Sequence, residues 1–148
     1  MRRPALIAAG AALGAALLQA PAALAAATLV VRTEGIQGTA GEVKVAVCDK
    51  SFDEAGCKLG GWRQPKGAVE EFVFENIPPG RYAIAAYHDA DGDGELDKFP
   101  PGIPTEPYGF SNEVGRIGIP SFEKALVEVG DGKTTTVVVR LAKFLGRS

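Results

Sequence analysis

The sequence predicts an all-β protein, a single antiparallel β-sandwich of about six or seven strands. Three observations predict this fold. Runs of β-branched and apolar residues are short, turn-forming residues separate them at regular spacing, and no stretch after the N-terminal segment keeps a helical apolar stripe. The 148 residues are 46% hydrophobic and 23% charged, which is ordinary for one packed domain and excludes a disordered chain.

Six segments are predicted strands. Residues 43–47 show the pattern most clearly, because Val43, Val45 and Val47 alternate with Lys44 and Ala46, as in a strand with one buried face. Two prolines and a glycine near residue 78 predict a turn, and a Gly-Asp-Gly sequence near residue 131 predicts a hairpin turn. The predicted strands are Thr28–Thr33, Val43–Val47, Val69–Phe74, Arg81–His88, Ala125–Val129 and Thr134–Leu141, and a seventh candidate lies near Val114–Ile119.

The N-terminus, residues 1–25, is predicted to be a secretory signal peptide. Arg2 and Arg3 form a short basic region, residues 5–18 are apolar and uncharged, and a small-x-small cleavage site ends at Ala25. No twin-arginine motif surrounds the basic pair, so we expect export of the unfolded chain by the Sec-type route to the periplasm or beyond.

Cleavage would leave a β-sandwich domain of residues 26–148. The alternative is a retained membrane anchor. Gln19 and Pro21 interrupt the apolar stretch before it reaches a spanning length, so no membrane span is expected after cleavage. Loss of two of the 16 basic residues, against 18 acidic ones, gives a net charge of −4. Such a chain, with no cluster of basic residues in its sequence, is a poor candidate for binding nucleic acid or an anionic membrane.

The chain contains two cysteines, Cys48 and Cys57. An exported protein meets an oxidising compartment, so an even number of cysteines predicts one disulfide between them. The alternative is a redox-active or metal-binding pair. The C-x-x-C spacing is absent and the one histidine, His88, lies far along the chain, so the structural disulfide is favoured.

An acidic segment, residues 89–97, predicts a cation site. Its Asp-x-Asp-x-Asp-Gly pattern is how a short loop presents oxygen ligands to Ca²⁺, and Gly94 permits the sharp turn that such a loop needs. Five carboxylates fall within these nine residues: Asp89, Asp91, Asp93, Glu95 and Asp97. Mg²⁺ suits the segment less well, because it retains water and needs fewer carboxylates.

The segment departs from an EF-hand at the position of the bidentate glutamate, where this chain has Pro100, and its flanks are not helical in pattern. A further ligand would have to come from later in the same loop, and Glu106 and Asn112 are the candidates. With few fixed ligands we expect weak Ca²⁺ affinity, about 10⁻⁵ to 10⁻³ M. The alternative is a plain polar turn whose carboxylates are solvated.

Three strings of residues resemble a family of secreted bacterial proteins, the domain of unknown function 2141. They are Gly80-Arg81-Tyr82-Ala83, His88-Asp89-x-Asp91-Gly92-Asp93-Gly94-x-Leu96-Asp97, and Gly102-Ile103-Pro104-Thr105-Glu106-Pro107-Tyr108-Gly109-Phe110-Ser111-Asn112. The resemblance covers about Val43–Arg140 and implies an exported prealbumin-like or Ig-like β-sandwich with no established activity. The family often has Asn where this chain has Asp91 and Asp93, and Thr-Asn where it has Lys98-Phe99.

The expected function is that of a non-catalytic binding or accessory module for an unidentified protein, peptide or glycan. One alternative is a carbohydrate- or peptide-binding module that uses Tyr108, Phe110 and Trp62, although loop aromatics also fold back onto a sheet in long loops. Another is a hydrolase in which His88 activates Ser111 or Ser121. No G-x-S-x-G elbow supports the hydrolase, so no enzymatic activity is expected.

Overall fold

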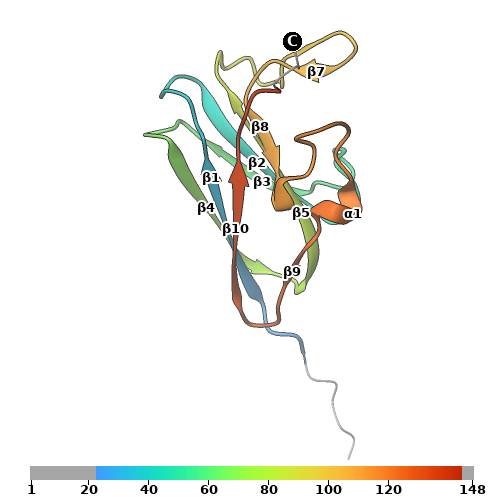
Figure 1. Ribbon diagram of the computed structural model, residues 1–148. Helices are drawn as coiled ribbons and strands as arrows, with labels where there is room; N and C mark the ends of the chain where they lie inside the picture. Colours follow the sequence, from blue (N-terminus) through green and yellow to red (C-terminus); the bar gives the residue numbers. More distant parts are fainter. Residues whose placement is uncertain (1–22, 145–148) are drawn as a thin grey trace, which may run out of the picture.

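The computed structural model describes residues 23–144 and shows an all-β protein (Figure 1). The predicted signal peptide lies outside these residues, apart from its last three. The described part holds a four-residue helix α1 (Phe122–Ala125) and a 3₁₀ turn η1 (Ser111–Glu113). Its strands are β1 (Ala27–Glu34), β2 (Glu42–Cys48), β3 (Leu59–Arg63), β4 (Val69–Ile77), β5 (Gly80–Asp89), β6 (Lys98–Phe99), β7 (Ile103–Pro104), β8 (Tyr108–Phe110), β9 (Val127–Val129) and β10 (Thr134–Arg140).

The strands form three sheets within the described residues. One has the order β10-β1-β4, and a second has the order β3-β2-β5-β8 with β9 paired to the start of β5. The short strands β6 and β7 form a ribbon of their own. The expectation of one antiparallel sandwich with six or seven strands is therefore not confirmed, because residues 23–144 form ten strands and β1 and β10 run parallel.

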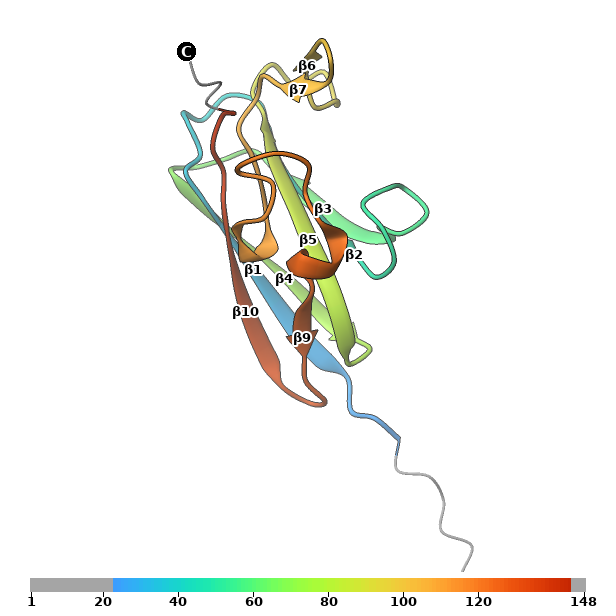
Figure 2. The same cartoon turned by 45° about the vertical axis from the view of Figure 1, so that its right-hand side comes forward.

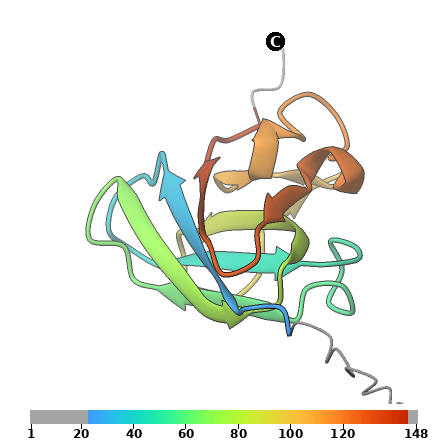
Figure 3. The same cartoon turned by 90° about the horizontal axis from the view of Figure 1, so that it is seen from below.

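A single hydrophobic core lies between the two larger sheets, which Figure 3 shows as two layers. Alternation along each strand turns every second side chain toward this core. The core includes Leu29 and Val31 of β1, Val43, Val45 and Val47 of β2, Ile84 of β5, and Val137 and Val139 of β10. A bridge between Tyr108 and Ala142 joins the edges of the two sheets on one side.

Five of the predicted strands form close to their expected bounds, a sixth forms only in its last three residues as β9, and the seventh candidate is not a strand. The segment Ala125–Val129 begins in helix α1, because the Ser121 hydroxyl accepts a hydrogen bond from the Lys124 amide and caps a helical turn. The segment Val114–Ile119 is a loop, because Gly115 and Gly118 have φ values of 79° and 88°, which break an extended strand.

The Gly-Asp-Gly turn also differs from its expected role as a hairpin turn. Strand β9 pairs with β5 in one sheet, whereas β10 pairs with β1 in the other. The turn therefore carries the chain from one sheet to the other, and β10 arrives beside β1 in the same direction. The buried side chains of Val137 and Val139 hold β10 in that sheet.

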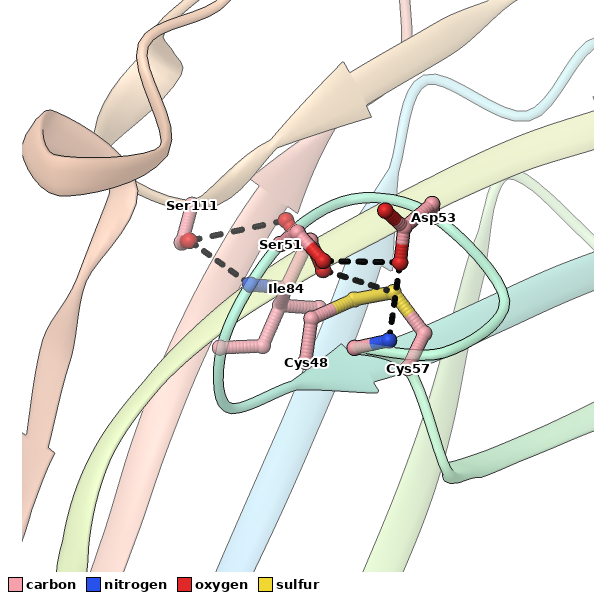
Figure 4. The surroundings of a disulfide bond; sticks show 7 residues. Cys48, Ser51, Asp53, Cys57, Ile84 and Ser111 are labelled. Carbon is pink, nitrogen blue, oxygen red and sulfur yellow. Dashed lines mark hydrogen bonds between the residues drawn. A yellow bond between two sulfur atoms is a disulfide. The ribbon is translucent and has the colours of Figure 1, made fainter.

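The predicted disulfide between Cys48 and Cys57 is confirmed, and Figure 4 shows its surroundings. It closes the loop that joins β2 to β3. Within the loop the Asp53 carboxylate accepts hydrogen bonds from the Ser51 hydroxyl (2.7 Å) and the Gly56 amide (2.9 Å). Phe52 packs against the rings of Phe110 and Phe122, so the disulfide loop is fixed to β8 and α1.

Within residues 23–144 no helix has the length and apolar character needed to cross a membrane.

Candidate metal centre

The long connection between β5 and β8 carries the acidic segment and is fixed at both ends. It begins at Asp89, the last residue of β5, and returns at Pro107, whose carbonyl accepts the His88 amide at 2.9 Å. Between these ends the β6–β7 ribbon folds over at the top of the molecule in Figure 1. The connection is therefore a folded loop with internal hydrogen bonds, as long functional loops are.

Asp89 organises the first half of the acidic segment. Its side chain is fully buried, and its two oxygens accept the amides of Gly92 (2.8 Å) and Gly94 (2.9 Å). The Lys44 ammonium lies 3.1 Å from Asp89 Oδ2 and 3.5 Å from an oxygen of Glu42. Buried carboxylates require such partners, because an unpaired buried charge costs several kcal/mol.

Glu106 closes the segment from the other end of the connection. It is 7% exposed, and its carboxylate accepts the amides of Ala90 at 2.7 Å and Asp97 at 3.2 Å. The Asp97 carbonyl in turn accepts the Thr105 amide at 2.8 Å. One carboxylate thus ties together the beginning and the end of the acidic segment.

Three of the six acidic residues considered as ligands meet in space. Asp89, Asp91 and Glu106 each offer a carboxylate oxygen, and these atoms lie within 4.8 Å of one another. The other three, Asp93, Glu95 and Asp97, are exposed and stand outside this group. Asn112 lies elsewhere, because its side chain donates hydrogen bonds to the carbonyls of Lys124 and Leu126.

The exposed Asp91 and Asp93 also shape the loop through local hydrogen bonds. Asp91 accepts the Asp93 amide at 3.2 Å, and Asp93 accepts the Glu95 amide at 2.8 Å. Both are local turns of the kind that Asp favours. Gly41 packs against the main chain of Asp89, and a β-carbon there would lie 1.9 Å from the Asp89 carbonyl oxygen. Only glycine permits this approach, and its φ of 69° also favours glycine.

Opposing charges and burial set the ionisation of the centre. Burial raises the pKa of Asp89, but the hydrogen bonds from Lys44, Gly94 and Gly92 outweigh it and hold the pKa below its usual range. The pKa of Asp97 is raised by desolvation and by the charges of the neighbouring carboxylates. Negative charge is therefore concentrated beyond what the one contacting cation, Lys44, neutralises among the described residues.

Lys44 is the member of the centre that sequence reasoning missed. The alternation of residues 43–47 places its side chain on the outer face of the sheet, but it does not show which strand lies beside it. In the structure β2 pairs with β5, which sets Lys44 opposite Tyr87 and Glu42 opposite Asp89. The missing information was the strand pairing.

His88 and the two serines considered for a hydrolase occupy structural positions. The His88 ring is buried, and its Nε2–H donates to the Ala40 carbonyl at 2.8 Å. The buried Ser111 hydroxyl donates to the Ala125 carbonyl at 2.6 Å. It also accepts the Ile84 amide at 2.9 Å, a bond that Figure 4 shows. Ser121 caps α1. No hydrogen bond joins His88 to either serine within residues 23–144.

The aromatic residues separate into packed and exposed members. The rings of Tyr108 and Phe110 are perpendicular to one another, at 77°, and the Tyr108 hydroxyl donates to the Gly115 carbonyl. Phe110 packs on Phe52, so these two loop aromatics form no flat exposed pair. Trp62 is different, because its side chain on edge strand β3 is 65% exposed.

Comparison with known proteins gives one match. Residues 31–137 match a family described as "Uncharacterized protein conserved in bacteria (DUF2141)". Neither the curated proteins nor the solved structures include a match.

Proposed function

The chain belongs to the uncharacterised bacterial family DUF2141, and from that premise we propose that it is an exported, non-catalytic β-sandwich module that binds a Ca²⁺-type cation in its acidic segment. The cation would order the connection between β5 and β8. The observation that carries the proposal is the convergence of Asp89, Asp91 and Glu106 from the two ends of that connection.

The donor set fits a hard cation. All three converging groups are carboxylates, and Ca²⁺ prefers oxygen ligands from carboxylates, carbonyls and water. No histidine or cysteine belongs to this group, which disfavours a transition metal. Ca²⁺ would supply positive charge to a loop in which carboxylates crowd one another, and the raised pKa of Asp97 is a sign of that crowding.

The hydrogen bonds already present argue for weak binding. Each carboxylate oxygen has two lone pairs, and on Asp89 Oδ2 these face the Gly94 amide and the Lys44 ammonium. A cation at this oxygen must compete with Lys44. We therefore expect a dissociation constant of about 10⁻⁵ to 10⁻³ M, the range of extracellular calcium modules.

The test is a thermal denaturation of the protein in EDTA, in Ca²⁺ and in Mg²⁺, joined to calorimetric titration with Ca²⁺. A dissociation constant of about 10⁻⁵ M implies that about 1 mM Ca²⁺ raises the free energy of unfolding by about 2.7 kcal/mol. The variant Asp91→Asn removes a converging carboxylate that has few structural contacts, and it should lose this response.

Asp131→Asn is the matched control, because Asp131 is an exposed carboxylate in the turn between β9 and β10. It should keep the full response to Ca²⁺. Equal melting temperatures in EDTA and in Ca²⁺, with no heat of binding, would contradict the proposal and leave the segment as a solvated turn held by Asp89 and Glu106.

A second candidate function is glycan binding on the outer face of the β3-β2-β5 sheet. Strand register aligns Trp62, Lys44 and Tyr87 in one row across three strands. The next row on the same face holds the small residues Gly60, Ala46 and Ala85. No large side chain of that row therefore lies beside Trp62. Exposed tryptophan rings supply large apolar contact area at binding surfaces.

Trp62 is the one tryptophan in the chain, so its fluorescence reports on this face directly. Titration with soluble oligosaccharides should shift or quench the emission if a sugar ring stacks there, and Lys44→Gln should weaken the effect. An emission spectrum unchanged across a panel of neutral and acidic glycans would remove this candidate.

A further inference from the structure

The loop between η1 and α1 exposes two large apolar side chains completely. Ile117 and Ile119 are 97% and 96% exposed, more than any other large apolar residue of the described chain. Single exposed apolar residues are common, but here two flank one glycine at the tip of one loop. The loop lies at the surface beside β8 and α1 (Figure 2).

The main chain at this tip is unbonded. Within the described residues, no hydrogen bond is donated or accepted by the main chain of residues 117–119. Gly118 has a φ of 88°, so the tip is a turn that ordinary residues adopt rarely. The tip therefore presents free amide donors next to two aliphatic side chains.

Basic residues surround the loop. A hollow of about 320 Å³ at its base is lined in part by Ile117, Ile119, Arg116 and Lys124. A neighbouring cavity of about 230 Å³ adds Arg140 and Lys143 to the same surface. Glu113 is bonded to Arg140 and lies 4.0 Å from Arg116, and Arg140 also lies 3.5 Å from Glu34. Lys124 and Lys143 make no ion pair among the described residues, so they carry the positive charge that this surface has in excess.

We propose that this loop is a contact site for an anionic lipid bilayer. Ile117 and Ile119 would enter the boundary between headgroups and acyl chains, where burial of an aliphatic side chain is favourable. Arg116 and Lys124 would face lipid phosphates, which can also accept the free amides of the tip. The chain as a whole is acidic, so the attraction is confined to this patch and is sensitive to salt.

The alternative occupant is a second copy of the chain. A bilayer is favoured over it because the patch combines aliphatic side chains with Lys124 and Lys143, which make no ion pair among residues 23–144, and a copy would bring the same lysines against one another. A bilayer with acidic headgroups supplies both an apolar phase and the opposite charge.

The test places a fluorescent reporter in the loop of the full chain. Trp62→Phe removes the native tryptophan, and Ile117→Trp then provides the single emitter. Vesicles contain phosphatidylcholine, about 30% phosphatidylglycerol and brominated lipid as a quencher. The loop reporter should shift to shorter wavelength and be quenched on vesicle addition. The matched control is Val73→Trp in the same background, because Val73 is a 54% exposed residue of β4, and it should not be quenched.

The Val73→Trp control shows whether quenching belongs to the loop or follows from attachment of the chain to the vesicle at another place. Equal quenching of both reporters, or none in either, would overturn the proposal. Ile119→Asn in the loop reporter and the pair Arg116→Gln and Lys124→Gln should each weaken partitioning by about tenfold or more. A blue shift that depends on protein concentration without lipid would identify a second copy as the occupant and would also overturn the proposal.

Discussion

Lys44 governs how much negative charge the acidic segment holds without a bound ion. Burial lowers the pKa of Lys44, but its hydrogen bond to Asp89 and the nearby negative charges outweigh burial and raise it. The ammonium therefore stays charged at neutral pH. It acts as an internal cation at a carboxylate that the proposed metal would also use.

Replacing Lys44 should separate the contribution of the acidic segment to stability from its proposed binding of Ca²⁺. Lys44→Gln leaves the buried Asp89 carboxylate without its ion pair, and we expect the free energy of unfolding in EDTA to fall by about 1–3 kcal/mol. The same change removes the competitor of Ca²⁺, so the rise in melting temperature on adding Ca²⁺ should exceed that of the wild-type chain.

Lys133→Gln serves as the control, since Lys133 is an exposed lysine in the turn before β10. It should leave both quantities unchanged. A Lys44→Gln protein that is destabilised and still insensitive to Ca²⁺ would show that the segment is a turn held by Lys44 alone.

The sequence identifies the individual acidic residues of the segment but does not show which of their side chains come together in space. The run of Asp and Gly identifies the segment. Glu106 enters the group because β8 returns beside β5, and Lys44 enters because β2 pairs with β5. Both depend on pairing between distant strands, which spacing along the chain does not encode.

Among the elements, the disulfide loop can be tested independently of the acidic segment. The double substitution Cys48→Ser and Cys57→Ser removes the disulfide, which joins two residues nine positions apart in the sequence. The unfolded chain then gains conformational freedom, and we expect a loss of about 2–3 kcal/mol in the free energy of unfolding, measured by urea denaturation. The response to Ca²⁺ should persist, and its loss would mean that the two regions are coupled.

Asp53 gives this loop a pH dependence of known sign. Its hydrogen bonds from the Ser51 hydroxyl and the Gly56 amide hold its pKa below the usual range. A carboxyl with a lowered pKa in the folded state stabilises the protein above its unfolded pKa, about 3.9, and this contribution is lost as pH falls through the folded value.

We therefore expect Asp53→Asn to melt at a lower temperature than the wild type at pH 7, and the difference to shrink as the pH falls below the unfolded pKa and through the lowered folded value. Thermal denaturation followed by circular dichroism across this range measures it. Glu54→Gln is the control, because Glu54 is an exposed neighbour in the same loop. A difference that grows on acidification would show that another group dominates.

The long regular elements were predictable and the short ones were not. Strands β1, β2, β4, β5 and β10 have clear alternation, whereas β3 contains two adjacent glycines that weaken any strand signal. Gly60 is nevertheless needed there, because a β-carbon would lie 2.7 Å from the Val45 carbonyl oxygen. The two- and three-residue strands β6, β7 and β8 are too short to show a period.

Across the whole molecule, the rate of amide hydrogen exchange should depend on whether a strand has partners on one side or on both. The central strands β1, β2 and β5 have partners on both sides, so their amides should exchange slowest. Residues 117–119 make no main-chain hydrogen bond in the described chain and should exchange within seconds. Protection of that loop in the free protein, measured by mass spectrometry, would contradict the described conformation.

The parallel pairing of β1 with β10 bears on how the chain reaches its folded state. These are the first and last strands of the described residues, and β1 is the centre of its sheet. That sheet cannot be completed until residue 140 has been synthesised, and contacts of such long sequence separation form slowly. If the chain is exported unfolded, as we propose, this delay would keep the nascent polypeptide competent for transport until its final strand has emerged.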